Sequence, residues 1–359
     1  MQDCLDIRAQ AARSGTPNHG RQHALQEVRP AAGRTRSHFI VGDAARGIQR
    51  KLVGPVAVVE RIIVGLLGSR GLMLIGEPGT AKSMVSELLA AAISGDSTLT
   101  VQGSAGVTDE HIKYGWNYAL LLAHGPGREA LVPAPIYRGM REGKLVRFEE
   151  LTRCSQETQD ALVSILSDKA MHVPELPDAA DRVLYAAPGF NLIGTANTRD
   201  RGVNEMSAAL KRRFNFETIR PIADVDAEVE LVVEESRRVL AGTGVAAPGP
   251  RALVEAIVTI FHELRAGRTR EGTSFERPST SMSTAEAIAL FCSASQACHH
   301  FGNGTLGAGE LVGHLAGTAI KDEPDDIRRV ADYFQTVVRA RADADPTWRA
   351  LFEARALLG

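Results

Sequence analysis

One stretch of the chain decides its fold: residues 71–83, which read GLMLIGEPGTAKS. The first part is a short apolar run typical of a buried strand, and the second is a Gly- and Pro-containing turn that leads into a helical pattern from Lys82 to about Ile93. Successive backbone N–H groups of such a turn can surround a phosphate chain, and the N-terminus of the following helix adds a partial positive charge. The stretch therefore predicts a phosphate-binding loop. An ordinary strand-to-helix turn with an incidental Lys is the alternative.

The turn follows the pattern G-x-x-x-x-G-K-[ST], in which the Lys reaches the β- and γ-phosphates and the hydroxyl contacts Mg²⁺. Ala81 occupies the place of the second Gly. Because an Ala can hold helical angles at the start of a helix, we expect this replacement to cost little. The residues expected to bind nucleotide are Gly76, Glu77, Pro78, Gly79, Thr80, Ala81, Lys82 and Ser83.

The surrounding sequence predicts a layered α/β domain. Further apolar runs at residues 99–101, 145–148, 190–193 and 216–219 are separated by helical or loop segments, and a helical stripe over residues 53–67 precedes the first run. Strands that alternate with helices need crossover connections, which favours a mainly parallel sheet covered on both faces. In the helical stripe, Val56, Val59, Ile63 and Leu67 are predicted to share one face.

The strand signal stops at Pro221. Helical patterns follow at residues 224–240, 250–264, 283–299, 309–320, 324–341 and 347–358, with Gly or Pro between them. We therefore expect an α/β nucleotide-binding domain over residues 48–222 and an all-α domain over residues 223–359. Residues 1–47 contain seven Arg, no Lys and four acidic residues without a sustained apolar period. They predict a flexible basic tail, and a basic arm that binds a partner is the alternative.

Three more groups of polar residues stand at strand ends. Glu149 and Glu150 follow an apolar run, where one acid can hold Mg²⁺ through its water shell and the second can polarise the attacking water. Asn197 ends the next run, and its amide can hold that water against the γ-phosphate. Arg212 and Arg213 precede the last strand and could stabilise charge on a neighbour's phosphates. Arg213 ranks first, because the residue after it should anchor the turn in the core.

These four signals, in this order, resemble the Walker A, Walker B, sensor 1 and arginine-finger motifs of AAA+ ATPases. More narrowly, the chain resembles the MoxR group of the helix-2-insert clade. Residues 115–136 are similar to the insert in helix 2, and residues 171–190 are similar to the hairpin before sensor 1. The phrase ALKRRFNF at residues 209–216 also resembles McrB-type GTPases. The resemblance covers about residues 48–355.

The resemblance implies a P-loop AAA+ core with a five-stranded parallel sheet, followed by an all-α lid domain. It implies a ring, usually a hexamer, with nucleotide between subunits and with ATP and Mg²⁺ as cofactors. MoxR-like members are chaperone-like remodelling ATPases, often with a von Willebrand factor A domain partner that helps to mature a target enzyme. The expected function is therefore Mg²⁺-dependent hydrolysis of ATP to ADP and phosphate, coupled to work on an unidentified client protein.

Two departures from the family pattern keep other functions open. Glu149 stands where Walker B normally has Asp, and one extra methylene could shift the hold on Mg²⁺ by about 1 Å. The sensor 2 Arg is absent from the segment Ser281–Glu286, and Arg277 upstream is a weak substitute. Both departures favour a nucleotide-dependent assembly switch or scaffold with vestigial hydrolysis. The Arg-Arg-Phe phrase suggests a third function, that of a GTP-using motor in a defence complex.

Composition excludes several classes of protein. The 359 residues are 44% hydrophobic and 23% charged, which excludes a disordered or collagen-like chain. The formal net charge of −2 gives no global field that would attract nucleic acid, so such a partner is not expected. No apolar run reaches the roughly 18 residues needed to cross a bilayer. The cysteines lack metal-ligand spacing, and we expect a cytoplasmic protein without a membrane or structural zinc.

Overall fold

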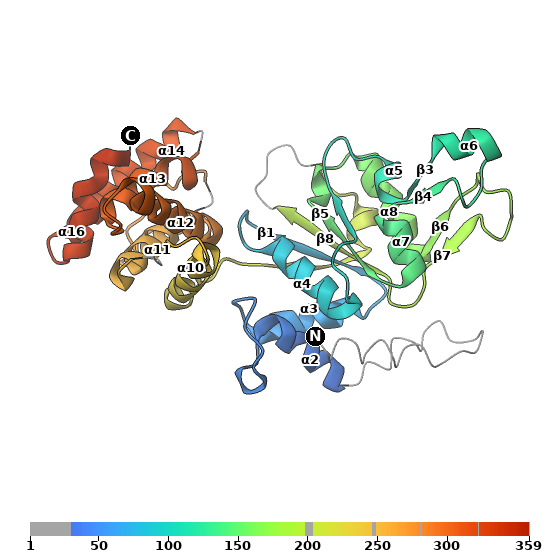
Figure 1. Ribbon diagram of the computed structural model, residues 1–359, viewed down its shortest axis with the longest axis horizontal. Helices are drawn as coiled ribbons and strands as arrows, with labels where there is room; N and C mark the ends of the chain where they lie inside the picture. The colour runs from blue at the N-terminus through green and yellow to red at the C-terminus, as the bar shows by residue number, and fades with distance from the viewer. Residues whose placement is uncertain (1–29, 198–203, 246–248, 281, 322, 359) are drawn as a thin grey trace. The chain divides into compact units, whose positions relative to one another are not determined.

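The computed structural model describes residues 30–197, 204–245, 249–280, 282–321 and 323–358. The chain forms two compact units, and each has its own hydrophobic core. The α/β unit ends at Ile219 and the helical unit begins at Arg220, while the short segment Glu77–Thr80 groups with the helical unit. Figure 1 shows the elements of each unit.

The α/β unit is built on a five-stranded sheet in the order β2-β5-β8-β1-β9, in which every neighbouring pair is parallel. This confirms the predicted parallel P-loop core. The last strand begins two residues earlier than predicted. Phe214 is buried whereas Phe216 is 45% exposed, as befits a strand at the sheet edge. The strands are β1 (Gly71–Gly76), β2 (Thr100–Gln102), β5 (Leu145–Glu149), β8 (Asn191–Asn197) and β9 (Phe214–Thr218).

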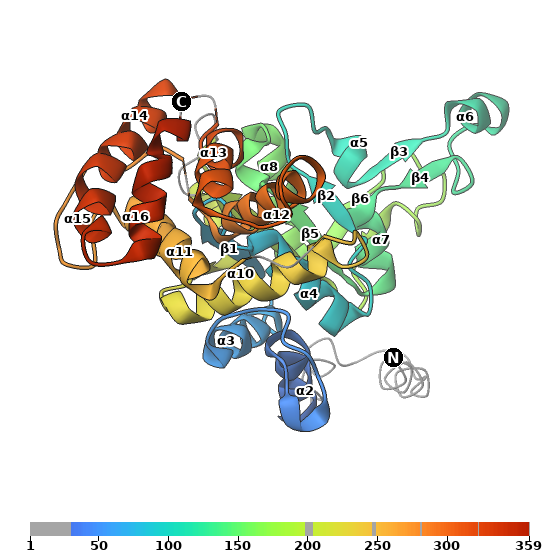
Figure 2. The ribbon, with the colours of Figure 1, turned by 60° about the vertical axis from the view of Figure 1, so that its left-hand side comes forward.

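Both faces of this sheet are covered, because successive residues of a strand point to opposite faces. Leu72 and Leu74 of β1 pack in one cluster with residues of the first helices, and Met73 packs in another cluster on the opposite face. Figure 2 shows the helices of this unit from a second direction. The helices are α3 (Val56–Leu66), α4 (Lys82–Ser94), α5 (Asp109–Ile112), α7 (Pro135–Glu142), η2 (Leu151–Arg153), α8 (Gln156–Asp168) and α9 (Ala208–Lys211).

The structure corrects two predictions at the start of the chain. Residues 30–47 were expected to belong to a flexible tail, but they form α2 (Pro30–Val41) and η1 (Ala44–Arg46). Ile40 is fully buried against α3, since a short apolar run in this segment completes the core on that side. In α3 the predicted residues Val59 and Ile63 are buried, whereas Val56 is 42% exposed. Residues 1–29 lie outside the described residues. For them, the prediction of a flexible tail and its alternative, a basic arm that binds a partner, both stay predictions.

Two small antiparallel sheets project from the α/β unit. One joins β3 (Tyr114–Trp116) and β4 (Leu131–Pro133) around α6 (Tyr118–His124), and the other is a hairpin of β6 (Ala170–His172) and β7 (Val183–Tyr185). No residue of α6 is buried. We refer to residues 114–133 as the insertion and to residues 170–185 as the hairpin.

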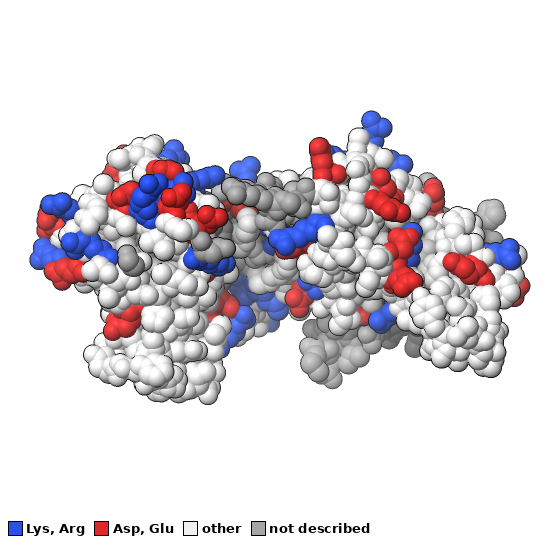
Figure 3. Space-filling model, turned by 90° about the horizontal axis from the view of Figure 1, so that it is seen from above, with Lys and Arg blue, Asp and Glu red and all other residues white. Residues whose placement is uncertain are grey.

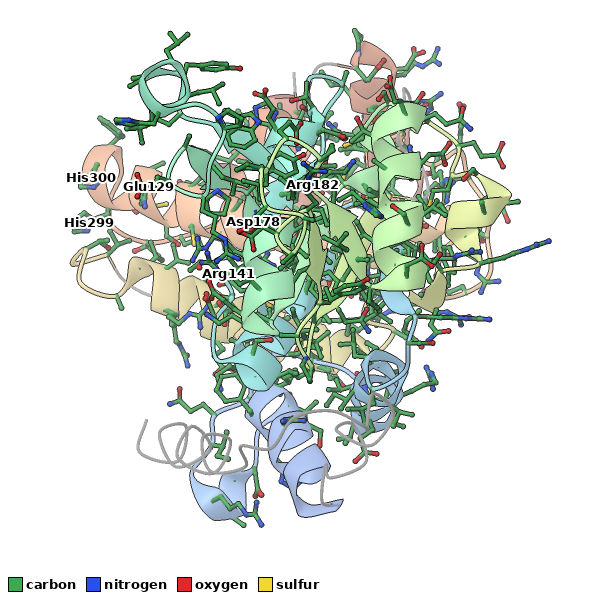
Figure 4. All side chains as sticks on the ribbon, turned by 90° about the vertical axis from the view of Figure 1, so that its right-hand side faces the viewer. Glu129, Arg141, Asp178, Arg182, His299 and His300 are labelled. Carbon is green, nitrogen blue, oxygen red and sulfur yellow. The ribbon has the colours of Figure 1, made fainter. Side chains whose placement is uncertain are left out.

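The insertion and the hairpin are fastened together by two side-chain contacts. The Tyr114 hydroxyl donates a hydrogen bond to Glu175 Oε2 at 2.9 Å, and the Arg128 guanidinium pairs with the Asp181 carboxylate. Figure 4 faces this end of the unit, where Asp178 and Arg182 of the hairpin come toward the viewer. The two projections therefore form one surface, although they lie apart in sequence.

The helical unit follows the predicted all-α pattern. Its core includes Ile257, Phe261, Phe291 and Phe334, which are all fully buried. The elements are α10 (Val225–Leu240), α11 (Arg251–Ala266), α12 (Thr284–Phe301), α13 (Ala308–Thr318), α14 (Pro324–Tyr333), the π-helical η3 (Phe334–Val338), α15 (Arg339–Ala342), α16 (Pro346–Glu353) and η4 (Ala354–Leu358).

A buried carboxylate holds the loop that leads into α12. Asp326 is fully buried and accepts hydrogen bonds from the backbone N–H and hydroxyl groups of Ser279 and Thr280, while Arg329 Nη1 lies 3.0 Å from Oδ1. Burial alone would raise the pKa of the Asp326 carboxyl, but these hydrogen bonds hold that pKa well below its ordinary value. The charged form of Asp326 therefore stabilises this loop.

This depressed pKa predicts acid-sensitive stability. An unfolded Asp has a pKa of about 3.9, so the contribution of Asp326 is complete above about pH 5 and is lost as pH falls through the folded pKa. We expect Asp326→Asn to lower the free energy of unfolding by about 2 kcal/mol at pH 7, and by less at pH 3. Urea unfolding at both pH values tests this, with the exposed Asp325→Asn as a matched control. An equal loss at both pH values would contradict the assignment.

On the face shown in Figure 3, Lys and Arg side chains are interspersed with Asp and Glu. Cys154, Cys292 and Cys298 are buried free thiols, and Cys4 lies outside the described residues. Among the residues that the structure describes, no helix combines the length and apolar character needed to span a bilayer.

Candidate nucleotide-binding site

The predicted phosphate loop lies between β1, which ends at Gly76, and α4, which begins at Lys82. Gly79 has a φ of +75°, which favours a residue without a Cβ, and the Thr80 hydroxyl closes the turn by donating to the Glu77 carbonyl at 2.8 Å. The Lys82 side chain is buried, and its Nζ donates to the Gly76 carbonyl at 3.2 Å. The ammonium group is thus folded back along the loop that it would serve.

Ala81 does not adopt the helical angles that the sequence led us to expect. Its φ and ψ are 64° and 23°, a left-handed conformation at the N-cap of α4. An L-residue in this region is destabilised by roughly 1–2 kcal/mol, because its Cβ approaches backbone oxygen. The expectation of a low cost was therefore wrong: closure of the loop imposes the conformation for which the motif normally uses Gly.

This strain predicts a stabilising substitution. Ala81→Gly removes the clash, but Gly also gives the unfolded chain more freedom, so we expect a net gain of up to about 1 kcal/mol in the free energy of unfolding. Ala92→Gly, in the same helix and without left-handed strain, should instead destabilise the protein by about 1 kcal/mol. Urea unfolding of both variants tests the sign, and a loss for Ala81→Gly as large as for Ala92→Gly would exclude strain at Ala81.

Glu149 is the most highly connected acid of the site. It is 4% exposed at the end of β5. Its Oε2 accepts hydrogen bonds from the hydroxyls of Ser83 and Thr195, each at 2.8 Å. Its Oε1 accepts from the Ser86 hydroxyl at 2.5 Å and from Arg147 Nη2 at 3.0 Å. The longer side chain of Glu, which the sequence presented as a possible defect, thus reaches the serine of the phosphate loop.

The same contacts keep Glu149 ionised. Burial alone would raise the pKa of its carboxyl, but the hydroxyls of Ser86, Ser83 and Thr195 and the charge of Arg147 outweigh burial, and the pKa lies below its ordinary value. A carboxylate with both oxygens held by donors is a suitable partner for a hard cation or its water shell. Ser83 and Glu149 therefore fit the Mg²⁺ role that the sequence predicted for them.

Glu150 follows directly and points to a different environment. It has a left-handed backbone with a φ of 53°, and its side chain is 32% exposed and pairs with Arg153 Nε at 2.7 Å. Its backbone N–H donates to the Thr195 hydroxyl at 2.9 Å. A non-Gly residue in this conformation costs of order 1–3 kcal/mol and is typical of functional sites. Glu150 is thus accessible to solvent, as a residue that polarises water must be.

Asn197 ends β8 beside the phosphate loop. In the parallel pairing of β1 with β8, Asn197 lies opposite Gly76, the first loop residue, and Thr195 lies two residues before it on the same strand. The carboxyl ends of the parallel strands thus bring Asn197 and the two acids to the edge of the sheet from which the loop begins.

The two arginines differ in their surroundings. Arg213 Nε donates to the Ser167 hydroxyl at 2.7 Å, and the following Phe214 is buried. Arg212, at the C-cap of α9, is exposed. The turn is anchored by Phe214 as expected, but the guanidinium of Arg213 is held by its own chain in this structure. In the helical unit, Arg277 is exposed, and Ser281 lies outside the described residues.

Sequence reasoning missed three residues of the site: Ser86, Arg147 and Thr195. Ser86 lies one helical turn after Ser83, Arg147 is a charged residue inside an apolar strand, and Thr195 is a polar residue within a buried one. Each was visible as a polar exception to a local pattern. Arg147 shares a face of β5 with Glu149, but only the packing of α4 and β8 against β5 shows that Ser86 and Thr195 meet the same carboxylate.

The phosphate loop follows β1, an inner strand of the sheet, and Glu149 ends β5, which is separated from β1 by β8. A helical unit follows this 2-5-8-1-9 sheet. The arrangement defines a P-loop ATPase of the AAA+ class. Residues 71–214 match the AAA domain of the dynein-related subfamily, and residues 226–359 match the YehL-like AAA+ ATPase C-terminal domain. The chain belongs to the YehL-like AAA+ ATPases. It is 52% identical to the uncharacterized protein YehL of Escherichia coli (strain K12) over 317 residues. The aligned residues cover 88% of this chain and 86% of YehL.

More distant similarities are partial. The uncharacterized protein SH1500 of Staphylococcus haemolyticus (strain JCSC1435) is 27% identical over 147 residues, 41% of this chain and 54% of its own length. Among solved structures, NtrX from Brucella abortus in complex with ADP aligns with a TM-score of 0.49 and 12% identity, over 86% of this chain and 64% of NtrX. This chain therefore spans less than two thirds of NtrX, and a similarity this distant indicates no function.

Proposed function

We propose that this protein binds and hydrolyses ATP with Mg²⁺ and acts as a MoxR-like, chaperone-like remodelling motor on a client protein. The observation that carries the ATPase proposal is the hydrogen bond between Ser83 Oγ and Glu149 Oε2, which joins the phosphate loop to the acid at the end of β5. An intact link of this kind favours hydrolysis over the alternative of a switch or scaffold with vestigial activity.

Each site residue then has a distinct role. Lys82 neutralises the β- and γ-phosphates, and Ser83 with Glu149 would hold Mg²⁺, the latter through water. When bound, that ion offsets the charge that develops on the phosphates. Glu150 polarises the attacking water and Asn197 orients it.

Arg212 and Arg213 complete the proposed machinery from outside the pocket. They would stabilise transition-state charge at the pocket of a neighbouring subunit. This role requires an oligomer, and we propose a ring of six subunits. In such a ring, every pocket would combine the loop of one subunit with the arginines of the next.

The remodelling role is supported by the insertion. Tyr118 and Leu122, one turn apart on α6, are 63% and 88% exposed. Large apolar side chains that project together into solvent are typical of surfaces that contact other proteins. We propose that the insertion and the hairpin correspond to those of the helix-2-insert clade, and that a von Willebrand factor A domain protein is the adaptor. A GTP-using, McrB-like motor remains the second candidate, because of the phrase at residues 209–216.

Nucleotide binding by Lys82 provides the direct test. We expect Lys82→Ala to lower ATP affinity by about 100-fold or more in calorimetry, because it removes charge-assisted hydrogen bonds to phosphate. The control variant Lys113→Ala should bind ATP like the wild type. Equal ATP affinity in Lys82→Ala and wild type would overturn the site.

Two further measurements on the wild type separate the candidate functions. Competition between ATP and GTP for binding identifies the base preference. Phosphate release at saturating ATP distinguishes a motor from a switch.

A further inference from the structure

Arg147 occupies an unusual place for a charged residue. It lies within β5, two residues before Glu149, so that both side chains leave the same face of the strand. The Arg147 side chain is only 11% exposed. A guanidinium buried in a central strand needs several acceptors, because an unsatisfied buried charge is strongly destabilising.

The guanidinium of Arg147 finds five hydrogen-bond acceptors on three segments of the chain. Its Nη2 donates to Glu149 Oε1 at 3.0 Å and to the Ser83 carbonyl at 3.2 Å. Its Nε donates to the Ser86 hydroxyl at 3.0 Å. Its Nη1 donates to the Ser97 carbonyl at 3.1 Å and the Thr100 hydroxyl at 3.3 Å. Arg147 thus connects β5 to the first turn of α4 and to the segment that enters β2.

This arrangement divides the two oxygens of Glu149 between different tasks. Oε1 is held by Arg147 and Ser86, whereas Oε2 accepts from the hydroxyls of Ser83 and Thr195. A Glu side chain has one more rotatable bond than Asp and would otherwise lose more entropy when fixed. With Oε1 fixed by Arg147 and Ser86, Oε2 stays aimed at the serine that would contact Mg²⁺, and Thr195 holds it from the next strand.

We propose that Arg147 is a positioning residue, which fixes the Glu149 carboxylate against Ser83 and so makes a Glu functional at a position that normally carries Asp. The inference rests on the proposed ATPase function for its meaning toward Mg²⁺, but the contact itself involves only this chain. Residues that orient metal ligands in this way typically contribute 10–100-fold to metal affinity or activity when mutated.

The first experiment separates positioning from general structural support. ATP affinity is measured by calorimetry in excess Mg²⁺ and in EDTA, for wild type, Arg147→Met, Arg147→Lys and the surface control Arg138→Met. We expect Arg147→Met to reduce the gain in affinity from Mg²⁺ by about tenfold or more while affinity in EDTA changes by less than about twofold. Arg147→Lys keeps the charge but not the planar donors, so its gain in ATP affinity from Mg²⁺ should lie between those of Arg147→Met and the wild type. An equal loss with and without Mg²⁺, or none, would overturn the proposal.

The second experiment needs no nucleotide, and it therefore tests the contact even if the protein fails to bind ATP. Thermal unfolding is compared in EDTA for wild type, Arg147→Met, Glu149→Gln and the double variant. Arg147→Met leaves the Glu149 carboxylate buried without its cation, so it should lower the unfolding temperature more in the wild-type background than in Glu149→Gln. Purely additive shifts would show that Arg147 does not hold Glu149. Coupling without a Mg²⁺ effect would show a structural ion pair and would overturn the positioning role.

Discussion

Glu150→Gln is expected to bind ATP within about twofold of the wild type but to hydrolyse it about 10²–10⁴-fold more slowly, the range that a general base contributes. The amide keeps the size of the side chain and its capacity for hydrogen bonds, but it cannot accept a proton from the attacking water. The structure supports this role, because Glu150 is the solvent-accessible acid of the pair whereas Glu149 is enclosed by donors. Calorimetry gives the affinity and phosphate release gives the rate.

Two further variants distinguish the roles of the acids. Glu149→Gln should weaken the dependence of activity on Mg²⁺, because the amide no longer offers a carboxylate to the ion's water shell. Glu157→Gln, at an exposed residue in the first turn of α8, should behave like the wild type. If Glu149→Gln stopped turnover with unchanged Mg²⁺ dependence while Glu150→Gln remained active, the two roles would be reversed.

A mixture of Arg213→Ala and Lys82→Ala subunits is expected to recover ATPase activity that neither variant has alone. An arginine supplied to a neighbour's phosphates contributes about 10³–10⁵-fold to the rate, with little effect on ground-state binding. Arg213→Ala keeps a sound pocket, and Lys82→Ala keeps a sound arginine. A pocket in the mixture that combines Lys82 of one subunit with Arg213 of the next should therefore be active.

The same experiment with Arg212→Ala decides which arginine acts. In the structure the Arg213 side chain is hydrogen-bonded to Ser167, whereas the Arg212 side chain is exposed. The two variants therefore remove the same type of residue at adjacent positions with different surroundings. The arginine that acts in trans is the one whose variant is inactive alone and complements Lys82→Ala. Full activity of both single variants, or failure to complement despite demonstrated co-assembly, would exclude a finger in trans. Two arginines that only meet surface acids would each contribute less than about 1 kcal/mol.

The sequence by itself was sufficient for the fold class and for the order of the candidate motifs. The phosphate loop is a continuous strand, turn and helix, so residues 71–83 display it without tertiary information. Glu149 and Asn197 could be grouped with it because parallel strands place their carboxyl ends at one edge of a sheet. Periodicity was likewise enough for the helical unit, whose helices have clear Gly and Pro boundaries.

Only the tertiary structure decided how the candidate residues are held. Ser86 meets Glu149 across 63 residues of sequence and Thr195 meets it across 46, so no local pattern contains these two contacts. Arg147 shares a strand face with Glu149, but its contacts with Ser83 and Ser86 of α4 arise only in the folded chain. The left-handed angles of Ala81 arise from closure of the loop, which local propensity for helix does not describe. Strand register and loop closure are collective properties of the folded chain, and they convert Glu149 from an apparent departure into an acid anchored at both oxygens.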